Sequence, residues 1–183
     1  LEVNLSKEQV HKILSKVKIS KSPGPDGFHP RLLWELRDVI CVPLSIIFNT
    51  SLRTGTVPED WKCANVTAIY KKGSKRVAGN YRPVSLTSVV CKTMETLIRN
   101  SLVEYMQKNN LFSKRQFGFI SGRSTVLQLL KVLDRWTEIL DSGGCIDVIY
   151  CDFMKAFDKV RNRRLIQLLH HYKISDPVLS LLM

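Results

Sequence analysis

The chain has 183 residues, of which 44% are hydrophobic; this excludes wholesale disorder and suffices for one domain with a core or for a lobe of a larger protein. Twenty-eight lysines and arginines against sixteen acidic residues give a formal charge of +12, which favours a polyanionic partner. The sequence contains neither a signal peptide nor an apolar run of about 18 residues, so we expect no membrane-spanning segment.

The first part of the chain predicts helices separated by a stiff loop. Ser6 and Gln9 have the spacing of a capping box, and the apolar residues that follow at three- and four-residue steps mark one helical face. The proline- and glycine-rich residues 22–27 predict a tight loop. A second helical region is expected from about residue 30 to residue 52, with Pro43 kinking or dividing it.

The middle of the chain predicts a short strand, a basic loop and a long helix. Gly55 and Pro58 end the second helical region, and residues 65–70 form a short strand. Residues 71–80, rich in Lys, Gly and Ser, predict a mobile basic hairpin or loop. From 87 to 108 the apolar residues recur with a helical period.

The last part predicts one more amphipathic helix, a strand and two further helices. Ser124 or Thr125 caps the helix, and residues 142–144 close it. Its apolar stripe is expected to be core and consists of Leu129, Leu130, Leu133, Trp136 and Leu140. A strand over 145–152, a helix from Ala156 and a last helix around 165–172 follow. The fold class is therefore α/β in the mixed (α+β) sense, with more helices than strands.

The positive charge is concentrated in two runs that contain no acidic residue. One extends from Trp61 to Met94 with seven basic residues, and the other from Tyr105 to Leu133 with five. Scattered, solvated surface lysines are the alternative explanation for any single run. Two such runs in one chain favour nucleic acid over a membrane surface as the partner.

The cysteines and histidines predict neither a disulfide framework nor a zinc site. Five cysteines are an odd number, no pair has CxxC spacing, and four histidines complete no zinc pattern. Small buried thiols in a reducing, intracellular compartment are the simplest interpretation, and we expect a nuclear and cytoplasmic location.

Asp152 is the main candidate for chemistry. It ends an apolar, β-branched run over 146–152, and an aromatic residue, Phe157, follows five positions later. A carboxylate at the end of a strand, in a basic chain, is well placed to hold a divalent cation against phosphate. A lone aspartate at a strand end also serves as a cap or turn residue.

Six sequence blocks, in this order, resemble the reverse transcriptases of non-LTR retrotransposons, and of Jockey-like elements in particular. The blocks are KSPGPDG at 21–27, VPEDWK at 57–62, IYKKG at 69–73, NYRPVSL at 80–86, QFGFISGRST at 116–125 and DFMKAFD at 152–158. The resemblance implies a right-hand polymerase, of which residues 1–144 are fingers-like and residues 145–183 begin the palm. The palm would hold only its first strand and the helices that follow, so the fold would be truncated relative to a complete enzyme.

The resemblance also implies roles for individual residues. Asp152 would be the catalytic, magnesium-binding aspartate, and Phe157 the bulky ring that excludes a ribose 2′-hydroxyl. Lys71, Lys72 and Arg82 would grip the triphosphate, although alternation along a strand would leave one of the two lysines in solvent. A set near the template strand would comprise Gln116, Gly118, Gly122 and Arg123.

Purely structural roles are alternative explanations for several of these residues. Phe157 can be an aromatic residue of the palm core, and the glycines at 118 and 122 can form a plain turn before a helix. Asp158 is expected to cap or orient local structure rather than to bind metal.

The implied cofactor is Mg²⁺, and the implied partners are an RNA template, a DNA primer or target-site DNA, deoxynucleoside triphosphates, and, in the parent protein, an endonuclease domain and the rest of the polymerase. The glycine/proline/glutamine block and the Ala-Asp-Asp hairpin that follow in the family do not occur before Met183. We therefore expect little or no polymerase activity from the chain by itself.

Two other functions compete. A catalytically dead nucleic-acid-binding remnant would bind RNA or a hybrid duplex with an affinity that falls steeply with salt. An intron-encoded reverse transcriptase with a splicing role fits the wording of the blocks less well.

Overall fold

The computed structural model describes residues 3–154, 156–157, 159–174 and 176–181. Its contacts divide the chain into two units. The first unit consists of Leu1–Tyr105 and Asn162–Met183, and the second of Met106–Arg161. Helices and a small sheet together confirm the mixed fold class. The expected boundary between fingers and palm at residue 144 stays a prediction, because these units are defined by contacts.

The first helix, α1 (Lys7–Leu14), begins at the expected capping box. Gln9 donates its backbone N–H to Ser6 Oγ at 3.3 Å, and Ser6 donates its N–H to Gln9 Oε1 at 2.9 Å. Asn49 fixes the segment before α1, since its side chain accepts from Leu5 N at 2.9 Å and donates to Leu5 O at 2.8 Å. These two hydrogen bonds hold the chain before α1 against the helix that contains Asn49.

The second helical region is divided, but not at Pro43. Helix α2 (Pro30–Glu35) ends at Leu36, whose φ of −87° and ψ of 3° interrupt the helix, and α3 (Arg37–Thr54) follows with Pro43 inside it. Proline removes the N–H that would bond to the carbonyl four residues earlier. The residue four positions before Pro43 is Val39, which is 72% exposed, so water can hydrate its carbonyl in place of the missing N–H. The expected division at Pro43 is therefore wrong.

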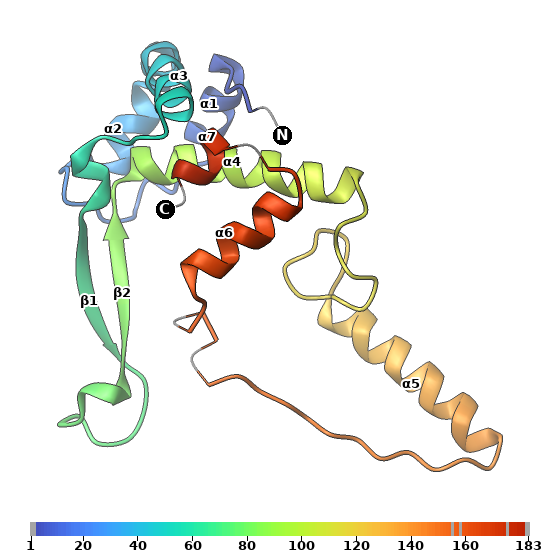
Figure 1. The fold of residues 1–183 in the computed structure, drawn as a ribbon. Coiled ribbons are helices and arrows are strands. Elements are labelled where there is room, and N and C mark those ends of the chain that lie inside the picture. Colours follow the sequence, from blue (N-terminus) through green and yellow to red (C-terminus); the bar gives the residue numbers. More distant parts are fainter. Residues whose placement is uncertain (1–2, 155, 158, 175, 182–183) are drawn as a thin grey trace. The chain divides into compact units, whose positions relative to one another are not determined.

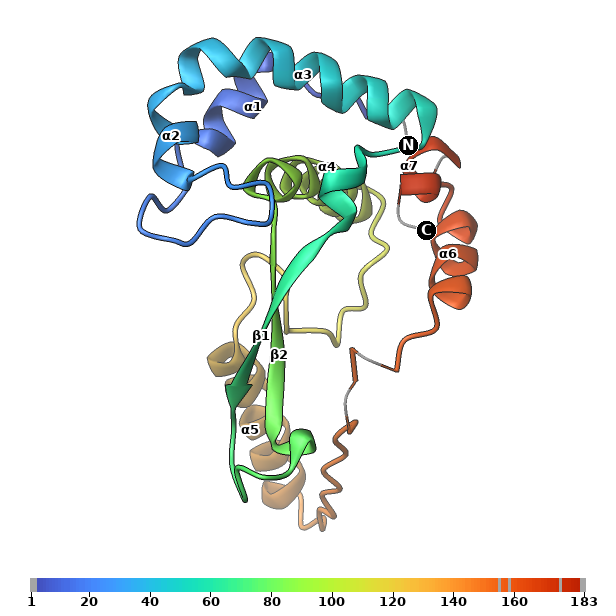
Figure 2. The ribbon, with the colours of Figure 1, turned by 90° about the vertical axis from the view of Figure 1, so that its left-hand side faces the viewer.

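A two-stranded antiparallel sheet follows the short 3₁₀ helix η1 (Glu59–Lys62). Strand β1 (Ala64–Tyr70) confirms the expected strand, and a second 3₁₀ turn, η2 (Ala78–Asn80), precedes β2 (Tyr81–Thr87). The register pairs Ala64 with Thr87 and Tyr70 with Tyr81. In both views the hairpin extends away from the helices of its unit (Figure 1, Figure 2).

Helix α4 (Val89–Lys108) confirms the expected long helix and carries the core of the first unit. Its buried residues Met94, Leu97 and Ile98 pack in one cluster with Phe48 of α3. Helices α1, α2 and α3 lie together on one side of α4 (Figure 1, Figure 2). The carboxyl-terminal helices α6 (Asn162–His171) and α7 (Asp176–Leu181) complete the cluster. Helix α6 confirms the helix expected near 165–172, but it is not the last, because α7 follows it and was not predicted.

Helix α7 packs closely against the end of α3. Gly55 ends α3 in the left-handed region, with φ of +66°, and a Cβ there would lie 2.7 Å from Ser180 Cβ. A glycine is thus required both by the backbone and by the neighbouring helix.

The second unit contains α5 (Thr125–Asp141), capped as expected by Ser124, whose Oγ accepts from Leu127 N at 3.2 Å. The expectation that its stripe is core is wrong for this structure. Leu129, Leu130, Leu133 and Leu140 are 53–58% exposed, and Trp136 is half-buried. The reason is that, within the described part of this unit, no second layer packs on the helix.

The expected strand over 145–152 is also absent. This segment runs extended (Figure 1), but the described residues provide no strand that pairs with it. Backbone groups form a strand only with a neighbour, and Ile149 and Tyr150 stay 86% and 88% exposed. The helix expected from Ala156 does not form either, because the described residues 156, 157 and 159 are turns and α6 begins only at Asn162. Lys155, Asp158 and the last two residues lie outside the described structure, and the role expected for Asp158 with them.

Candidate functional site

The hairpin holds the three cations expected to meet a triphosphate. Arg82 lies in β2 directly opposite Ile69 of β1. Lys71 follows β1, and its backbone N–H donates to Asn80 O at 2.9 Å, which continues the ladder by one residue. Side chains directly opposite one another, or two residues apart on a strand, share a face. The register therefore places Lys71 on the face of Ile69 and Arg82, whereas Lys72 lies in the bend that follows.

Polar and aromatic contacts order the turn of this hairpin. Tyr81 Oη donates to Lys75 O at 2.9 Å, and Asn80 Nδ2 donates to Ser74 O at 2.9 Å. The rings of Tyr70 and Tyr81 meet edge to face at 5.7 Å, and Lys75 Nζ lies 5.7 Å from the centre of the Tyr70 ring. Gly73 provides the left-handed backbone, with φ of +86°, that the turn needs. The expected basic hairpin is confirmed.

The side chains of the basic residues in and beside this turn are exposed. They are Lys71, Lys72, Lys75, Arg76 and Arg82. A guanidinium holds two phosphate oxygens in a fork, and an ammonium adds a mobile point charge. The hairpin is therefore chemically suited to an oligophosphate.

In the second unit, Arg123 organises the loop that precedes α5. Its Nη1 donates to Ser113 O at 2.8 Å and to Gln116 O, and the guanidinium lies 5.9 Å from the centre of the Phe117 ring. Gln116 Nε2 donates to Gly118 O at 3.2 Å within the same loop. Two of the expected template residues, Gln116 and Arg123, are thus brought together. Arg123 uses one nitrogen on its own loop and retains further donors.

The two glycines expected near the template differ. Gly122 has φ of +77°, a left-handed conformation that favours glycine at the start of a helix. Gly118 has no such φ, and a Cβ there would meet open space. A plain turn therefore explains Gly122, whereas the backbone gives no conformational reason for Gly118.

Asp152 and Phe157 lie on the exposed segment after α5. The Asp152 side chain is exposed, and Phe157 is 81% exposed. The Phe157 ring contacts the Phe119 ring edge to face, with centres 6.2 Å apart and planes at 90°. Phe119 belongs to the loop of Arg123 and has a left-handed φ of 63°. The structure thus joins the expected sugar-contacting residue to the expected template loop.

The described residues supply the type of metal donor but not the number. Asp152 offers the hard carboxylate oxygens that Mg²⁺ prefers. Within residues 3–154, 156–157, 159–174 and 176–181, however, no group of three His, Cys, Asp or Glu side chains is placed to hold a metal ion. These residues therefore do not complete a metal site.

Cys41 and Cys91 are buried, whereas Cys63, Cys145 and Cys151 are exposed, so the expectation of buried thiols is wrong for these three. The buried Cys91 is not a nucleophile. Burial, reinforced by the charge of Glu95 and a hydrogen bond to it, raises the pKa of the Cys91 thiol to about 12. Cys91 Sγ lies 3.6 Å from Glu95 Oε1. The thiol stays protonated, and hence unreactive, across the physiological range.

A family model described as "Reverse transcriptase (RNA-dependent DNA polymerase)" matches residues 69–183. The chain belongs to the reverse transcriptase family. The match includes the hairpin cations, the loop of Arg123 and the segment with Asp152 and Phe157. The family expected from the six sequence blocks is confirmed.

Individual relatives of this reverse transcriptase chain come from mobile elements. It is 31% identical to "Probable RNA-directed DNA polymerase from transposon BS" and 32% identical to "RNA-directed DNA polymerase from mobile element jockey", both from Drosophila melanogaster. Each comparison covers 84% of the chain and 17% of the relative. The chain thus spans about one sixth of the length of these relatives. The similarity also extends into the part that precedes residue 69.

In this reverse transcriptase chain, sequence reasoning missed two features near the site. It missed strand β2, because Pro83 lies in it; proline is tolerated here since both strands of the sheet are edges. It also missed Phe119 as the partner of Phe157. A run of three aromatic or glycine residues at 117–119 indicates a turn, but not which ring will meet a residue nearly forty positions later.

No helix in the described residues is both long and apolar enough to span a bilayer.

Proposed function

We propose that this chain supplies the fingers and the beginning of the palm of an RNA-directed DNA polymerase of right-hand type. The main observation in support of this proposal is the contact between Phe157 and Phe119. It links the residue that would exclude a ribose 2′-hydroxyl to the loop that would lie along the template. The family match across both residues supports the same assignment.

In the proposed reaction the primer 3′-hydroxyl oxygen forms a bond to the α-phosphorus of a deoxynucleoside triphosphate, and the bond to the β-phosphate bridge breaks and releases pyrophosphate. Mg²⁺, when bound, would favour the alkoxide and screen the leaving group. We assign Asp152 as one of its carboxylate ligands, with the others provided by the rest of the polymerase.

The cations of the hairpin would neutralise the triphosphate. Arg82 supplies a two-donor fork, and we assign the point charge to Lys71 rather than to Lys72, since the register places Lys71 on the face of Arg82. Lys72 is left for solvent or for a nucleic-acid phosphate. The loop of Gln116, Gly118, Gly122 and Arg123 would lie along the template backbone, where an arginine contributes affinity without reading sequence.

The partners proposed for the parent protein are an RNA template and a DNA primer provided by the target site. The basic composition supports a polyanionic partner for the chain itself. An endonuclease in the same parent would provide the nicked target.

Replacing Phe157 by valine in the complete polymerase is expected to relax the choice of sugar. Without the ring, a ribose 2′-hydroxyl no longer collides, and the preference for deoxynucleotides should fall roughly 10- to 100-fold, the range for losing one steric contact. The measurement is the ratio of kcat/KM for a deoxynucleotide to that for the matching ribonucleotide. Phe153→Val is the matched control, because Phe153 is 82% exposed on the same segment. An unchanged ratio in Phe157→Val would contradict the assignment of Phe157 as the residue that excludes a ribose 2′-hydroxyl.

A further inference from the structure

The hairpin that carries Arg82 joins the core of the first unit through a single residue. Strand β2 ends at Thr87 and α4 begins at Val89, so only Ser88 lies between them. Ser88 is fully buried, and its Oγ accepts from the backbone N–H of Cys91 at 3.2 Å, which caps the first turn of α4. The direction in which the hairpin leaves the helix is therefore set at Thr87 and Ser88, which we call the β2–α4 joint.

The loop before α2 packs against the backbone of this joint. Gly24 is buried, and a Cβ at this position would lie 2.7 Å from Ser88 N and from the carbonyl carbon and oxygen of Thr87. Gly24 has no left-handed φ, so close approach rather than backbone conformation requires a glycine here. The neighbouring atoms belong to the backbone and cannot rotate away as a flexible side chain can. An alanine would have to separate the two segments by about 0.8 Å to reach ordinary contact near 3.5 Å.

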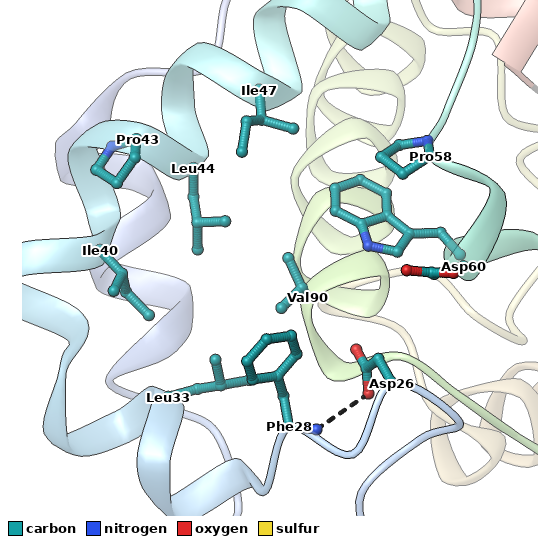
Figure 3. Close-up of a pocket in the computed structure, with 11 residues that line it drawn as sticks. Asp26, Phe28, Leu33, Ile40, Pro43, Leu44, Ile47, Pro58, Asp60 and Val90 are labelled. Carbon is teal, nitrogen blue, oxygen red and sulfur yellow. Dashed lines mark hydrogen bonds between the residues drawn. The ribbon is translucent and has the colours of Figure 1, made fainter.

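Hydrogen bonds make this loop stiff. Gly24 O accepts from the backbone N–H of Gly27 at 3.1 Å. Asp26 Oδ1 accepts from the backbone N–H of Phe28 at 3.3 Å (Figure 3). Asp26 and Val90 line the same pocket, so the loop lies beside the first turn of α4 (Figure 3). Residues 24–28 thus form a rigid block against the β2–α4 joint, and we call them the joint loop.

A small displacement at the joint is amplified along the hairpin. Arg82 lies five residues before Thr87, or about 17 Å along the strand. At the base of the hairpin Thr87 pairs with Ala64 of β1, and neighbouring strands lie about 4.8 Å apart. A shift of about 0.8 Å across that width tilts the hairpin by about 10° and moves Arg82 by roughly 3 Å. A guanidinium loses its two-donor contact with phosphate oxygens over such a distance.

We propose, on the basis of the proposed function, that the joint loop is a positioning element for the incoming nucleotide. It fixes the angle between the hairpin and α4, and hence the places of Lys71 and Arg82 at the triphosphate. Gly24 itself touches neither the nucleotide nor the reacting atoms, so it is a positioning residue. A change at Gly24 therefore alters the affinity for the nucleotide.

The test compares Gly24→Ala with the unaltered, complete polymerase in single-turnover primer extension at increasing deoxynucleotide concentration. This measurement yields the Kd for the nucleotide, the rate at saturation, and the amplitude, which reports the fraction of active enzyme. In Gly24→Ala the Kd should rise roughly tenfold, the effect of losing one charge-assisted hydrogen bond. The rate at saturation should change by less than about threefold, as expected when ground-state binding is lost. A protein that is merely destabilised would lose amplitude at an unchanged Kd.

Gly79→Ala is the matched control. It adds the same methyl group to the hairpin itself, at a position without a left-handed φ where a Cβ meets open space. Its Kd should be unchanged. Asp26→Ala loosens the joint loop without adding an atom at the joint and should raise the Kd about threefold, whereas Asp26→Asn keeps the oxygen that accepts from Phe28 and should not.

An unchanged Kd in Gly24→Ala would overturn the proposal, as would an equal rise in Gly79→Ala. If Gly24→Ala has no active fraction, an unchanged Kd in Asp26→Ala would overturn it. Failure of the unaltered polymerase to extend the primer would instead contradict the proposed function itself.

Discussion

Replacing Asp152 by asparagine is expected to abolish DNA synthesis by a polymerase that contains this chain and the remainder of its catalytic domain. The amide keeps the size of the side chain but removes the charge that would hold a divalent cation. A metal ion contributes several kcal/mol to such a transition state, so the rate of nucleotide addition should fall by about three orders of magnitude or more. The measurement is single-turnover primer extension at saturating nucleotide.

Asp147→Asn is the matched control, because Asp147 is an exposed acid five residues earlier on the same extended segment. It should retain near-normal extension. Affinity for the primer–template should be unchanged in both variants, since Asp152 adds a negative charge and makes no favourable contact with phosphate. A variant Asp152→Asn that extends primers at the unaltered rate would show that this carboxylate is not a metal ligand.

Phe48→Ala is expected to cause the largest loss of stability in the first unit. Phe48 is fully buried at the centre of the cluster, and its ring meets Trp61 edge to face with centres 5.8 Å apart. Truncating a buried phenylalanine removes its transfer free energy and leaves a cavity, at a cost of about 3–5 kcal/mol. The free energy of unfolding in urea, followed by tryptophan fluorescence, measures the loss.

The control is Ile46→Ala on the same helix. Ile46 is 62% exposed, so its truncation should change the free energy of unfolding by less than about 1 kcal/mol. If both variants lost the same stability, Phe48 would not be at the centre of the core as described.

The parts of the fold that could be predicted from the sequence depend on local chemistry. The Ser6–Gln9 capping box, the Ser124 cap and the period of α4 are set within a few residues, and the structure confirms each. Pro43 shows the limit of a local rule, because a proline on an exposed side of a helix loses a hydrogen bond that water replaces.

The parts that could not be predicted depend on partners distant in sequence. An apolar run such as 145–152 is typical of a buried strand, but its backbone forms a ladder only beside another strand, and the described residues provide none. The same reason leaves the apolar stripe of α5 exposed. β-Strand β2, in contrast, forms because β1 is close in sequence.

The sequence likewise predicted one part of the candidate site and left another part to the structure. The blocks identified Asp152, Phe157, Arg82 and the adjacent lysines as residue types; the family match covers them all, and their individual roles stay predictions. The register of the hairpin was needed to separate Lys71 from Lys72, and the ring contact was needed to connect Phe157 with its loop. The tight loop over 22–27 was predicted, whereas the hydrogen bond from Phe28 N to Asp26 Oδ1 and the burial of Asp26 Oδ2 without a partner were not.

The most direct test is whether the complete element protein copies RNA into DNA. A DNA primer annealed to a defined RNA template is incubated with the protein, Mg²⁺ and the four deoxynucleoside triphosphates, and the product is sequenced. The proposed function predicts a full-length DNA complement of the template, formed only when Mg²⁺ and deoxynucleotides are both present. A folded protein that binds the primer–template but leaves the primer unextended would contradict it.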